Sequence, residues 1–382
     1  MSPSPATYRE CVRCLMDTSD PDIFFDAEGI CNHCHRYEVV AAKRLIPLAG
    51  RPARLAALVD EIKREGNGKA YDCVIGVSGG VDSTYVAYLT HELGLRPLAL
   101  HFDNGWNSEL AVANIEKTLK TLGVDLYTYV VDWPEFRDLQ LSFLRASTPD
   151  GEVPTDHAIV ALLYRMARKH GLKHILLGVN VISEAVMPLK WGYGYSDFRY
   201  IGAVHRQFGS LALKTYPRYS LPQLFNFMFV RKIVLVPLLD YVDYRKNEAM
   251  DVIKSKLGWT YYGGKHYESI YTRFFQSYVL PRKFNIDKRR AHYSNLVMSE
   301  QISRDEALRL VNEPIYSEEG LASDREYAVK KLALTDKEFD AIMALPPKTF
   351  LDYPNSYKRI EAAKKVIAGL RGALSRRRPA AP

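Results

Sequence analysis

The sequence predicts an α/β fold with a mostly parallel, doubly wound sheet. Short apolar segments with the length of buried strands occur at residues 73–77, 97–102, 126–131, 174–177 and 233–237. Helical patterns occur between the first four of these segments, at residues 83–93, 108–122, 135–145 and 155–170. A further helical pattern follows the fifth segment, at residues 244–257. Strands that alternate with helices pair in parallel, and the helices cover both faces of the sheet. Ligands of such sheets bind beyond the carboxyl ends of the strands, where the strand order reverses.

The first fifty residues carry two C-x-x-C pairs and few long apolar runs. The pairs are separated by sixteen residues and consist of Cys11 with Cys14 and Cys31 with Cys34. This spacing is typical of a four-thiolate zinc site, in which the metal supplies the stability that so small a core lacks. Four thiolates complete a tetrahedron and leave no place for water, so we expect a structural zinc ion. Two disulfides are the alternative, and among other side chains His33 or His35 can substitute as ligands.

The first strand runs directly into the turn Ser78-Gly79-Gly80-Val81-Asp82-Ser83, which opens a helix. Two glycines let consecutive N–H groups converge on an anion, and the helix start adds further unpaired N–H groups. The turn lacks the lysine of a Walker loop. It resembles the SGGxDS loop of the pyrophosphate-loop ATPases (HUP type), which split ATP between the α and β phosphates. The resemblance implies an ATP and Mg²⁺ site at Ser78, Gly79, Gly80, Asp82 and Ser83; an ordinary strand-to-helix turn is the alternative.

Two further strand ends are candidate parts of the nucleotide site. Asp103 ends the second strand, and Gly178 and Asn180 follow the fourth. In the superfamily that the loop resembles, the second strand end lies beside the adenosine and the fourth closes the nucleotide pocket. A turn chosen only for its backbone geometry is the alternative at Asp103.

The segments beyond the fourth strand are less regular. Residues 190–219 show no clear periodicity and predict a long functional loop or a small insertion. Residues 263–269 have the composition of a lid or substrate loop, residues 271–280 of a buried helix, and residues 281–290 form a dense basic cluster. Helices follow, with capping boxes predicted at Ser303/Glu306 and Thr335/Glu338.

We therefore expect four parts in the chain. They are a zinc-ribbon module at 1–50, a pyrophosphate-loop ATPase domain at 51–240, a substrate loop with a helical C-terminal extension at 241–372, and a disordered tail at 373–382.

Composition and charge narrow the class of protein. The chain has 382 residues, of which 47% are hydrophobic and 25% charged, as in globular proteins, and its net charge of +8 favours anionic partners. The longest apolar stretch, residues 225–239, is interrupted by Asn226 and by Arg231 and Lys232, so it cannot span a bilayer. Because no apolar leader follows Met1, we expect a cytoplasmic protein without a membrane partner.

Together these motifs resemble the N-acetyl sugar amidotransferase (WbpG-like) family of bacterial surface-polysaccharide pathways. The resemblance rests on the cysteine pairs, on the loop, and on Gly263-Gly264-Lys265-His266-Tyr267-Glu268-Ser269 with the block that follows it through Lys283-Phe284 and Asp287-Lys288-Arg289. It implies an enzyme of lipopolysaccharide O-antigen biosynthesis. The implied substrate is a UDP-linked N-acetyl sugar acid, whose acetamido group becomes an acetamidino group.

The chemistry follows from the low reactivity of an amide. Transfer of AMP to the amide oxygen, with loss of pyrophosphate, creates a good leaving group, and ammonia then displaces AMP to leave an amidine. We expect Lys265, Lys283 or Arg289 to neutralise charge on the α-phosphate and the leaving group. With Asp82 they form the predicted catalytic set. Asp82 orients the loop or helps to hold Mg²⁺. A base must take a proton from ammonia, and the unranked candidates are His157, Asp156 and Glu184.

The source of ammonia is expected to lie outside the chain. A glutaminase commonly needs a cysteine nucleophile, but four of the five cysteines belong to the two pairs and Cys73 lies in the first strand. Free ammonia or a separate glutaminase is therefore expected. The family resemblance implies a HisH-like glutaminase subunit with a HisF-like companion.

Two other functions remain open from the sequence. Several tRNA thiolases also join a pyrophosphate loop to N-terminal cysteine pairs, but their sulfur transfer often uses a cysteine near the nucleotide, and none follows Cys73. A zinc-ribbon nucleic-acid adaptor would need basic and aromatic residues around the cysteines. That segment instead carries five acidic residues, so no nucleic-acid partner is expected: Asp17, Asp20, Asp22, Asp26 and Glu28.

Overall fold

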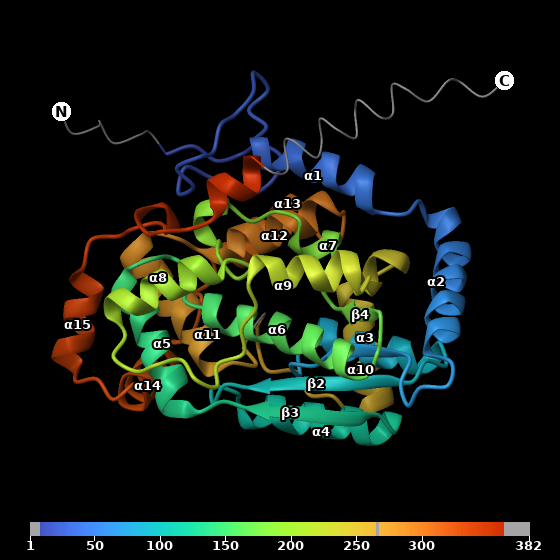
Figure 1. Cartoon of the computed structure of the whole chain (residues 1–382). Coiled ribbons are helices and arrows are strands. Elements are labelled where there is room, and N and C mark those ends of the chain that lie inside the picture. Colours follow the sequence, from blue (N-terminus) through green and yellow to red (C-terminus); the bar gives the residue numbers. More distant parts are fainter. Residues whose placement is uncertain (1–7, 265–266, 363–382) are drawn as a thin grey trace.

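The computed structural model describes residues 8–264 and 267–362 and has a five-stranded parallel sheet at its centre (Figure 1). The strand order is β3-β2-β1-β4-β5, and every neighbouring pair runs parallel. The strands coincide with the five predicted from the sequence and are β1 (Cys73–Gly76), β2 (Pro97–Asp103), β3 (Asp125–Val130), β4 (His174–Leu177) and β5 (Val234–Pro237). The predicted α/β fold is therefore confirmed. The strand order reverses between β1 and β4, where such sheets bind ligands.

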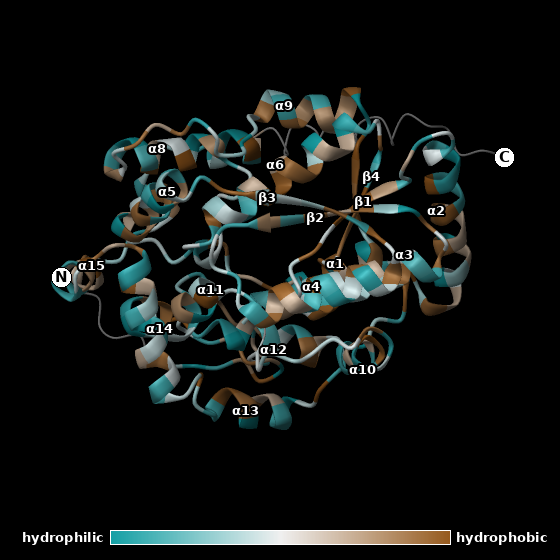
Figure 2. Ribbon diagram, turned by 90° about the horizontal axis from the view of Figure 1, so that it is seen from below, coloured by the Kyte–Doolittle hydropathy of each residue, from teal (hydrophilic) through white to brown (hydrophobic). Residues whose placement is uncertain are grey.

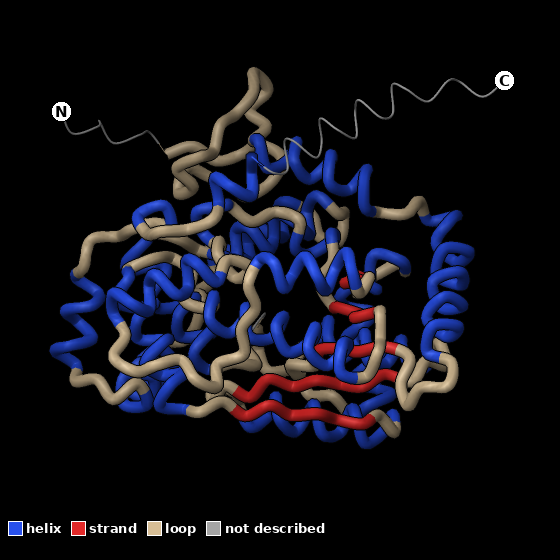
Figure 3. Tube along the Cα trace, viewed as in Figure 1, coloured by secondary structure: helices blue, strands red, loops and turns tan. Residues whose placement is uncertain are grey.

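Both faces of the sheet are buried, because successive strand residues point to opposite sides. Val74 and Leu98 belong to the apolar core on one face, whereas Ile75 and Ala99 belong to the core on the other. The first face is covered by α5 (Trp133–Ala146), α6 (Val153–Lys169) and α8 (Phe198–Phe208), and the second by α2 (Arg51–Gly66), α3 (Val81–Glu92), α4 (Glu109–Leu122) and α10 (Lys246–Leu257). Figure 3 shows the strands enclosed by these helices.

The N-terminal cysteine segment lies over the C-terminal helices and not over the sheet (Figure 1). It leads into α1 (Asn32–Arg44), which η1 (Leu48–Gly50) joins to α2. Leu15 packs against Ala307 and Val311 in a small separate core, and its N–H donates a 3.0 Å hydrogen bond to Ser294. The cysteine segment thus packs against residues 294–311 of the C-terminal part.

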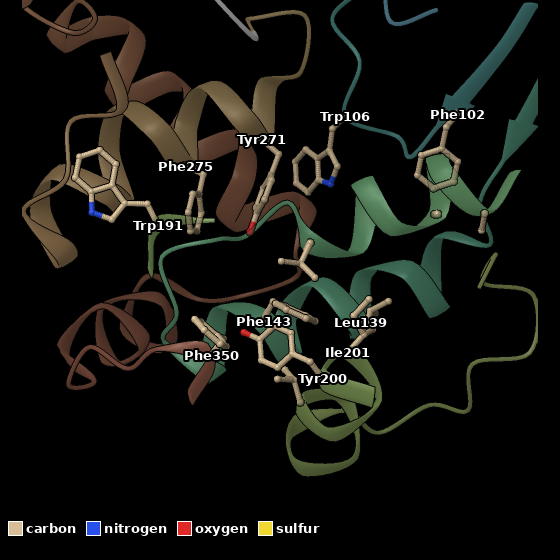
Figure 4. Packing of buried hydrophobic residues seen from close by; sticks show 14 of the residues in the cluster. Phe102, Trp106, Leu139, Phe143, Trp191, Tyr200, Ile201, Tyr271, Phe275 and Phe350 are labelled. Carbon is tan, nitrogen blue, oxygen red and sulfur yellow. The ribbon is translucent and has the colours of Figure 1, made fainter. Parts of the chain in front are cut away.

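The C-terminal part is helical, as predicted. Its elements are α11 (Ile270–Phe274), the π-helix η5 (Phe275–Phe284), α12 (Lys288–Met298), α13 (Arg304–Asn312), α14 (Glu318–Lys331), α15 (Asp336–Ala344) and η6 (Phe350–Asp352). Tyr271, Phe274 and Phe275 are buried, which confirms the predicted buried helix, and Figure 4 shows Tyr271 and Phe275 packed beside Trp106. The Thr335/Glu338 capping box is present. At α13 the Ser303 side chain caps the helix by accepting a hydrogen bond from the Glu306 N–H. The predicted tail at 373–382 lies outside the described residues.

The segment predicted as a loop or small insertion at 190–219 contains a helix that the sequence analysis did not predict. Asp197 accepts hydrogen bonds from the N–H groups of Arg199 and Tyr200 and begins α8. Five of its eleven residues are buried, namely Tyr200, Ile201, Ala203, Val204 and His205. The glycines and prolines on either side of the helix obscured this pattern in the sequence. The remaining connections contain α7 (Val181–Glu184), η2 (Leu189–Trp191), α9 (Leu221–Phe225), the π-helix η3 (Asn226–Val230) and η4 (Leu238–Tyr241). None of the helices in the described residues combines the length and hydrophobicity needed to cross a bilayer.

Candidate active site and metal centre

A cavity of about 590 Å³ opens at the carboxyl ends of β1, β2 and β4. These strand ends flank the point where the strand order reverses, so the cavity has the position expected of a ligand site. Its volume is in the range of small-molecule sites. Residues from the loop after β1, from α6 and from the C-terminal helices all line it. Figure 2 views the strand ends and the surrounding helices from below.

The loop after β1 has the shape of an anion site. Gly79 has φ +81°, and a Cβ atom there would lie 2.6 Å from the carbonyl oxygen of Ala111, so only glycine fits. The hydroxyls of Ser78 and Ser83 are 3.1 Å apart, and the Ser78 N–H donates to Ser83. Ser78, Gly80, Asp82 and Ser83 line the cavity, whereas Gly79 is turned toward α4.

Aromatic residues that follow β5 support this loop from behind. The indole N–H of Trp259 donates a 2.8 Å hydrogen bond to the carbonyl oxygen of Gly79, and the buried hydroxyl of Tyr244 donates to the carboxylate of Asp82. Gly178 packs so closely that a Cβ atom would lie 3.0 Å from the backbone of Asp82. These contacts hold the loop before any ligand arrives. The sequence analysis missed Tyr244 and Trp259, since nothing local marks a side chain that supports a distant turn.

Of the other residues predicted at strand ends, one lines the cavity and two do not. Gly178 lines the cavity, but Asn180 is buried and caps α7 by accepting from the N–H of Ser183. Asp103 does not line it and accepts hydrogen bonds from Gly105 and Asn107 instead. At the end of β2 the cavity is lined by its neighbours, His101, Asn104 and Asn107.

Three carboxyl groups from the start of α6 and the residues before it line the cavity, at Asp150, Glu152 and Asp156. Burial, together with the charge of Asp150, raises the pKa of Glu152 to about 7. Burial and the two neighbouring carboxylates also raise the pKa of Asp156, although solvent in the cavity reaches its side chain. Lys288 is the cation that offsets this effect at all three groups. The sequence analysis named Asp156 only as a candidate base and did not find Asp150 or Glu152.

Two lysines that were not predicted line the cavity, Lys246 of α10 and Lys288 of α12. His292, one helical turn after Lys288, lines it as well. Lys283 lies elsewhere and donates to the carbonyl oxygens of Ile342, Met343 and Leu345 at the end of α15. Burial lowers the pKa of Lys283 to about 8.

Arg289 also points away from the cavity. It pairs with Asp287 at 2.8 Å and donates to the carbonyl oxygens of Leu310, Val311 and Glu313 at the end of α13. Lys283 and Arg289 therefore cap helix C-termini, where cations are favourable. Lys265 lies outside the described residues.

Two of the three candidate bases line the cavity and the third does not. Asp156 and Glu184 line the cavity, whereas His157 does not. The Nδ1–H of His157 donates to the carbonyl oxygen of Tyr195 at 2.6 Å, and its Nε2 accepts from the N–H of Tyr219. Burial lowers the pKa of His157 to about 4, so the ring is neutral near pH 7 and both nitrogens are occupied. Asp156 and Glu184 remain as candidates.

The four cysteines of the two pairs form a compact, buried cluster. Their Sγ atoms all lie within 4.8 Å of one another, and three Sγ–Sγ distances are 3.6 to 3.8 Å. Tetrahedral zinc with Zn–S bonds of about 2.3 Å separates sulfurs by about 3.8 Å, so the donor set fits zinc. His33 instead bonds Asp20 at 2.7 Å, and His35 bonds Asp26 at 2.8 Å.

The cysteine segment is docked on α12 and α13. Arg290 of α12 forms ion pairs with Glu10 at 2.8 Å and with Asp17 at 3.0 Å. Arg304 of α13 pairs with Glu10 at 2.7 Å and donates to the carbonyl oxygen of Cys11. The cluster therefore stabilises the same helix that carries Lys288 and His292.

Comparison with known proteins identifies the C-terminal part. Residues 268–366 match the family model described as LPS biosynthesis protein WbpG-like, C-terminal domain. No curated protein matches the chain at a significant level.

Solved structures show weaker likenesses. A predicted subunit of tRNA methyltransferase from Methanocaldococcus jannaschii is 14% identical, with 47% of this chain and 74% of that chain covered and a TM-score of 0.28. NMN synthetase from Francisella tularensis is 15% identical (60% and 93% covered, TM-score 0.26). The NH3-dependent NAD synthetase from Campylobacter jejuni is 15% identical (55% and 84% covered, TM-score 0.29). At these TM-scores the likenesses carry no argument about function.

The raised pKa of Glu152 predicts a specific pH dependence of stability. A carboxyl group whose pKa rises from about 4.3 when unfolded to about 7 when folded binds its proton more tightly in the folded state. Its contribution is full below about pH 4 and is lost as the pH rises to about 7. We expect Glu152→Gln to be more stable than wild type at pH 8 by about 1–2 kcal/mol, a figure reduced for solvent in the cavity, and to show a smaller loss between pH 5 and 8. Thermal melts at both pH values test this, with Glu116→Gln on exposed α4 as the control; equal pH dependence of wild type and Glu152→Gln would contradict it.

The cysteine cluster predicts one tightly bound zinc ion per chain. Cys14→Ser leaves three thiolates, so we expect loss of the metal and faster amide exchange in residues 8–44 and in α12, while the sheet stays protected. Metal analysis and hydrogen exchange measure these effects. Cys73→Ala, which changes a thiol outside the cluster, should keep the full zinc content. Absence of zinc from the wild type, or an iron–sulfur chromophore, would overturn the assignment.

Proposed function

We propose that the chain is an ATP-dependent amidotransferase of lipopolysaccharide O-antigen biosynthesis, because residues 268–366 match the WbpG-like C-terminal domain. The proposed substrate is a UDP-linked N-acetyl sugar acid, whose acetamido group becomes an acetamidino group. One observation carries the proposal: the WbpG-like domain and the loop after β1 line the same cavity, through Lys288 and His292 on one side and Ser78 and Ser83 on the other.

The proposed reaction has two steps. The amide oxygen attacks the α-phosphorus of ATP, the bond between the α-phosphorus and the bridging oxygen breaks, and pyrophosphate leaves. Ammonia then attacks the resulting imidate carbon, AMP departs with the former amide oxygen, and the ammonia nitrogen loses a proton. The sum is amide, ATP and ammonia to amidine, AMP and pyrophosphate.

The residues around the cavity suit these steps. The hydroxyls of Ser78 and Ser83, which line the cavity, and the N–H groups at the start of α3 would hold the pyrophosphate. Lys288 supplies the positive charge that phosphoryl transfer requires near the α-phosphate, in place of the Lys283 and Arg289 expected from the sequence. Asp156 or Glu184 accepts the proton from ammonia. Asp82 and Glu268, which line the cavity beside the loop, fit Mg²⁺, a cation that binds through one or two carboxylates and the phosphates whose charge it neutralises.

The nitrogen source is proposed to be free ammonia or a separate glutaminase, HisH-like with a HisF-like companion. Four cysteines are clustered, and the fifth, Cys73, is buried in β1, where burial raises the pKa of its thiol. Each thiol of the chain is thus withheld from a glutamine substrate.

The proposal predicts the products of ATP cleavage. Incubation of the chain with ATP, Mg²⁺, ammonium and a panel of UDP-acetamido sugars should release AMP and pyrophosphate with one sugar and form its amidine. Asp82→Asn should lower the rate by about 10²-fold or more while the circular dichroism spectrum stays unchanged, because the substitution acts on a ligand-facing turn. Release of ADP and phosphate would contradict the proposal.

Two lysines of the basic cluster provide a matched test of position. Lys288→Ala should lower kcat/KM by about 10²-fold or more, because it removes a cation from the cavity. Lys283→Ala should lower the melting temperature and leave kcat nearly unchanged, because Lys283 only caps α15. Steady-state kinetics and thermal melts of both variants measure the difference. The reverse pattern would restore Lys283 as the catalytic lysine.

The cysteine positions predict how nitrogen is used. The purified chain should form amidine with high ammonium and not with glutamine, and glutamine should become a substrate when a separate HisH-like glutaminase is added. Amidine formation and glutamate release are measured together. Glutamine hydrolysis by the chain alone, at a rate that matches amidine formation, would show that Cys73 must be reconsidered.

A further inference from the structure

An apolar ridge projects from the surface at α9 and η3. We define the ridge as Leu221, Phe225, Met228, Phe229 and Val230, whose exposed fractions lie between 39 and 65%. The rings of Phe225 and Phe229 are 4.8 Å apart. Phe227 lies between them in sequence, but it is buried and stacks on Tyr164. The segment is thus anchored to the core by one aromatic side chain while five apolar neighbours stay exposed to solvent.

The chain around the ridge is basic without exception. Residues 198–239 contain no Asp or Glu, and their cations are Arg199, Arg206, Lys214, Arg218, Arg231 and Lys232. Each of the six is exposed, and none has an ion-pair partner among the residues that the structure describes. Arg218 precedes the ridge, and Arg231 and Lys232 follow it directly. The surface therefore combines apolar side chains with unpaired positive charge.

The position of the ridge makes it accessible. α8 and α9 lie along the same edge of the molecule in Figure 2, and β5, which follows the ridge, is an edge strand of the sheet. The ridge residues do not line the 590 Å³ cavity. Contact at the ridge therefore leaves the proposed active site open.

The charges favour one kind of partner. A second copy of the chain would bring the same unpaired cations together across a two-fold axis, and each copy has a net charge of +8. An anionic surface pairs with those cations. A lipid surface also accepts a projecting ridge without a matching hollow, because headgroups and acyl chains rearrange around it.

We propose that the apolar ridge and the flanking cations bind the chain to the surface of an anionic membrane. The ridge side chains enter the boundary between headgroups and acyl chains, and Arg218, Arg231 and Lys232 pair with anionic headgroups. The interrupted apolar stretch at 225–239, which is too polar to span a bilayer, supplies part of this surface. The proposal departs from the sequence-based expectation of no membrane partner, which rested on the lack of a spanning segment. This attachment is independent of the proposed reaction.

Vesicle sedimentation of the full chain tests the proposal. Wild type should bind vesicles of phosphatidylcholine with about one-third phosphatidylglycerol, bind neutral phosphatidylcholine vesicles much more weakly, and release as salt rises. Phe225→Ser with Phe229→Ser should weaken binding on the order of tenfold or more, because two exposed rings no longer enter the lipid. Arg231→Gln with Lys232→Gln should weaken it about fivefold for each cation removed.

Matched substitutions at the opposite edge of the sheet are the controls. Val130→Ser on β3 removes an apolar side chain that is 66% exposed, and Lys117→Gln with Lys120→Gln on α4 removes two exposed cations. Both controls should bind like wild type, and all variants should keep the wild-type circular dichroism spectrum. Failure of wild type to bind anionic vesicles would overturn the proposal, as would equal binding by the ridge variants. A wild-type dimer that the ridge substitutions make monomeric, without vesicle binding, would assign the ridge to a second copy.

Discussion

The attachment of α12 to the cysteine segment is the contact on which the proposed site depends. Arg290 holds Glu10 and Asp17 on one side of the helix, while Lys288 and His292 face the cavity on another. Asn295 fixes the same helix to the chain after β4, because its side chain both accepts from the N–H and donates to the carbonyl oxygen of Val186. Removing one partner from such a half-buried pair leaves a charge without compensation. The cysteine segment, far from the loop in sequence, thus helps to position the two α12 side chains that line the cavity.

The rest of the cavity shows the cost of a site built for charged ligands. Burial raises the pKa of Asp150, Glu152 and Asp156, and the charge of Asp150 raises the pKa of the other two further. Lys288 offsets this only in part. Tyr244 and Trp259 hold the loop after β1 through hydrogen bonds to Asp82 and Gly79. The conformation of this loop requires glycine at position 79. A pre-formed loop binds an anion without first being ordered. Strain and like charge at one place, offset by packing elsewhere, are typical of functional sites.

Local features of the sequence predicted the local parts of the structure. The five strands, the cysteine cluster and the loop after β1 each depend on adjacent residues, and each was found. Which basic residue at 281–290 lines the cavity could not be predicted from adjacent residues. Asp287 caps α12 by accepting from the N–H of Arg289, and the packing of that helix decides that Lys288 faces the cavity while Arg289 turns to α13. Asp150 and Glu152 were missed for a related reason, since only the fold brings them to the cavity.

The central claim is that the chain transfers AMP to an amide oxygen, and an isotope measurement tests it most directly. The sugar substrate is prepared with ¹⁸O in the acetamido carbonyl, and the AMP formed during amidine synthesis is analysed by mass spectrometry. The account predicts one ¹⁸O atom in each AMP, because the former amide oxygen leaves bound to the α-phosphorus. AMP without the label, or amidine formation with ADP as the product, would contradict it.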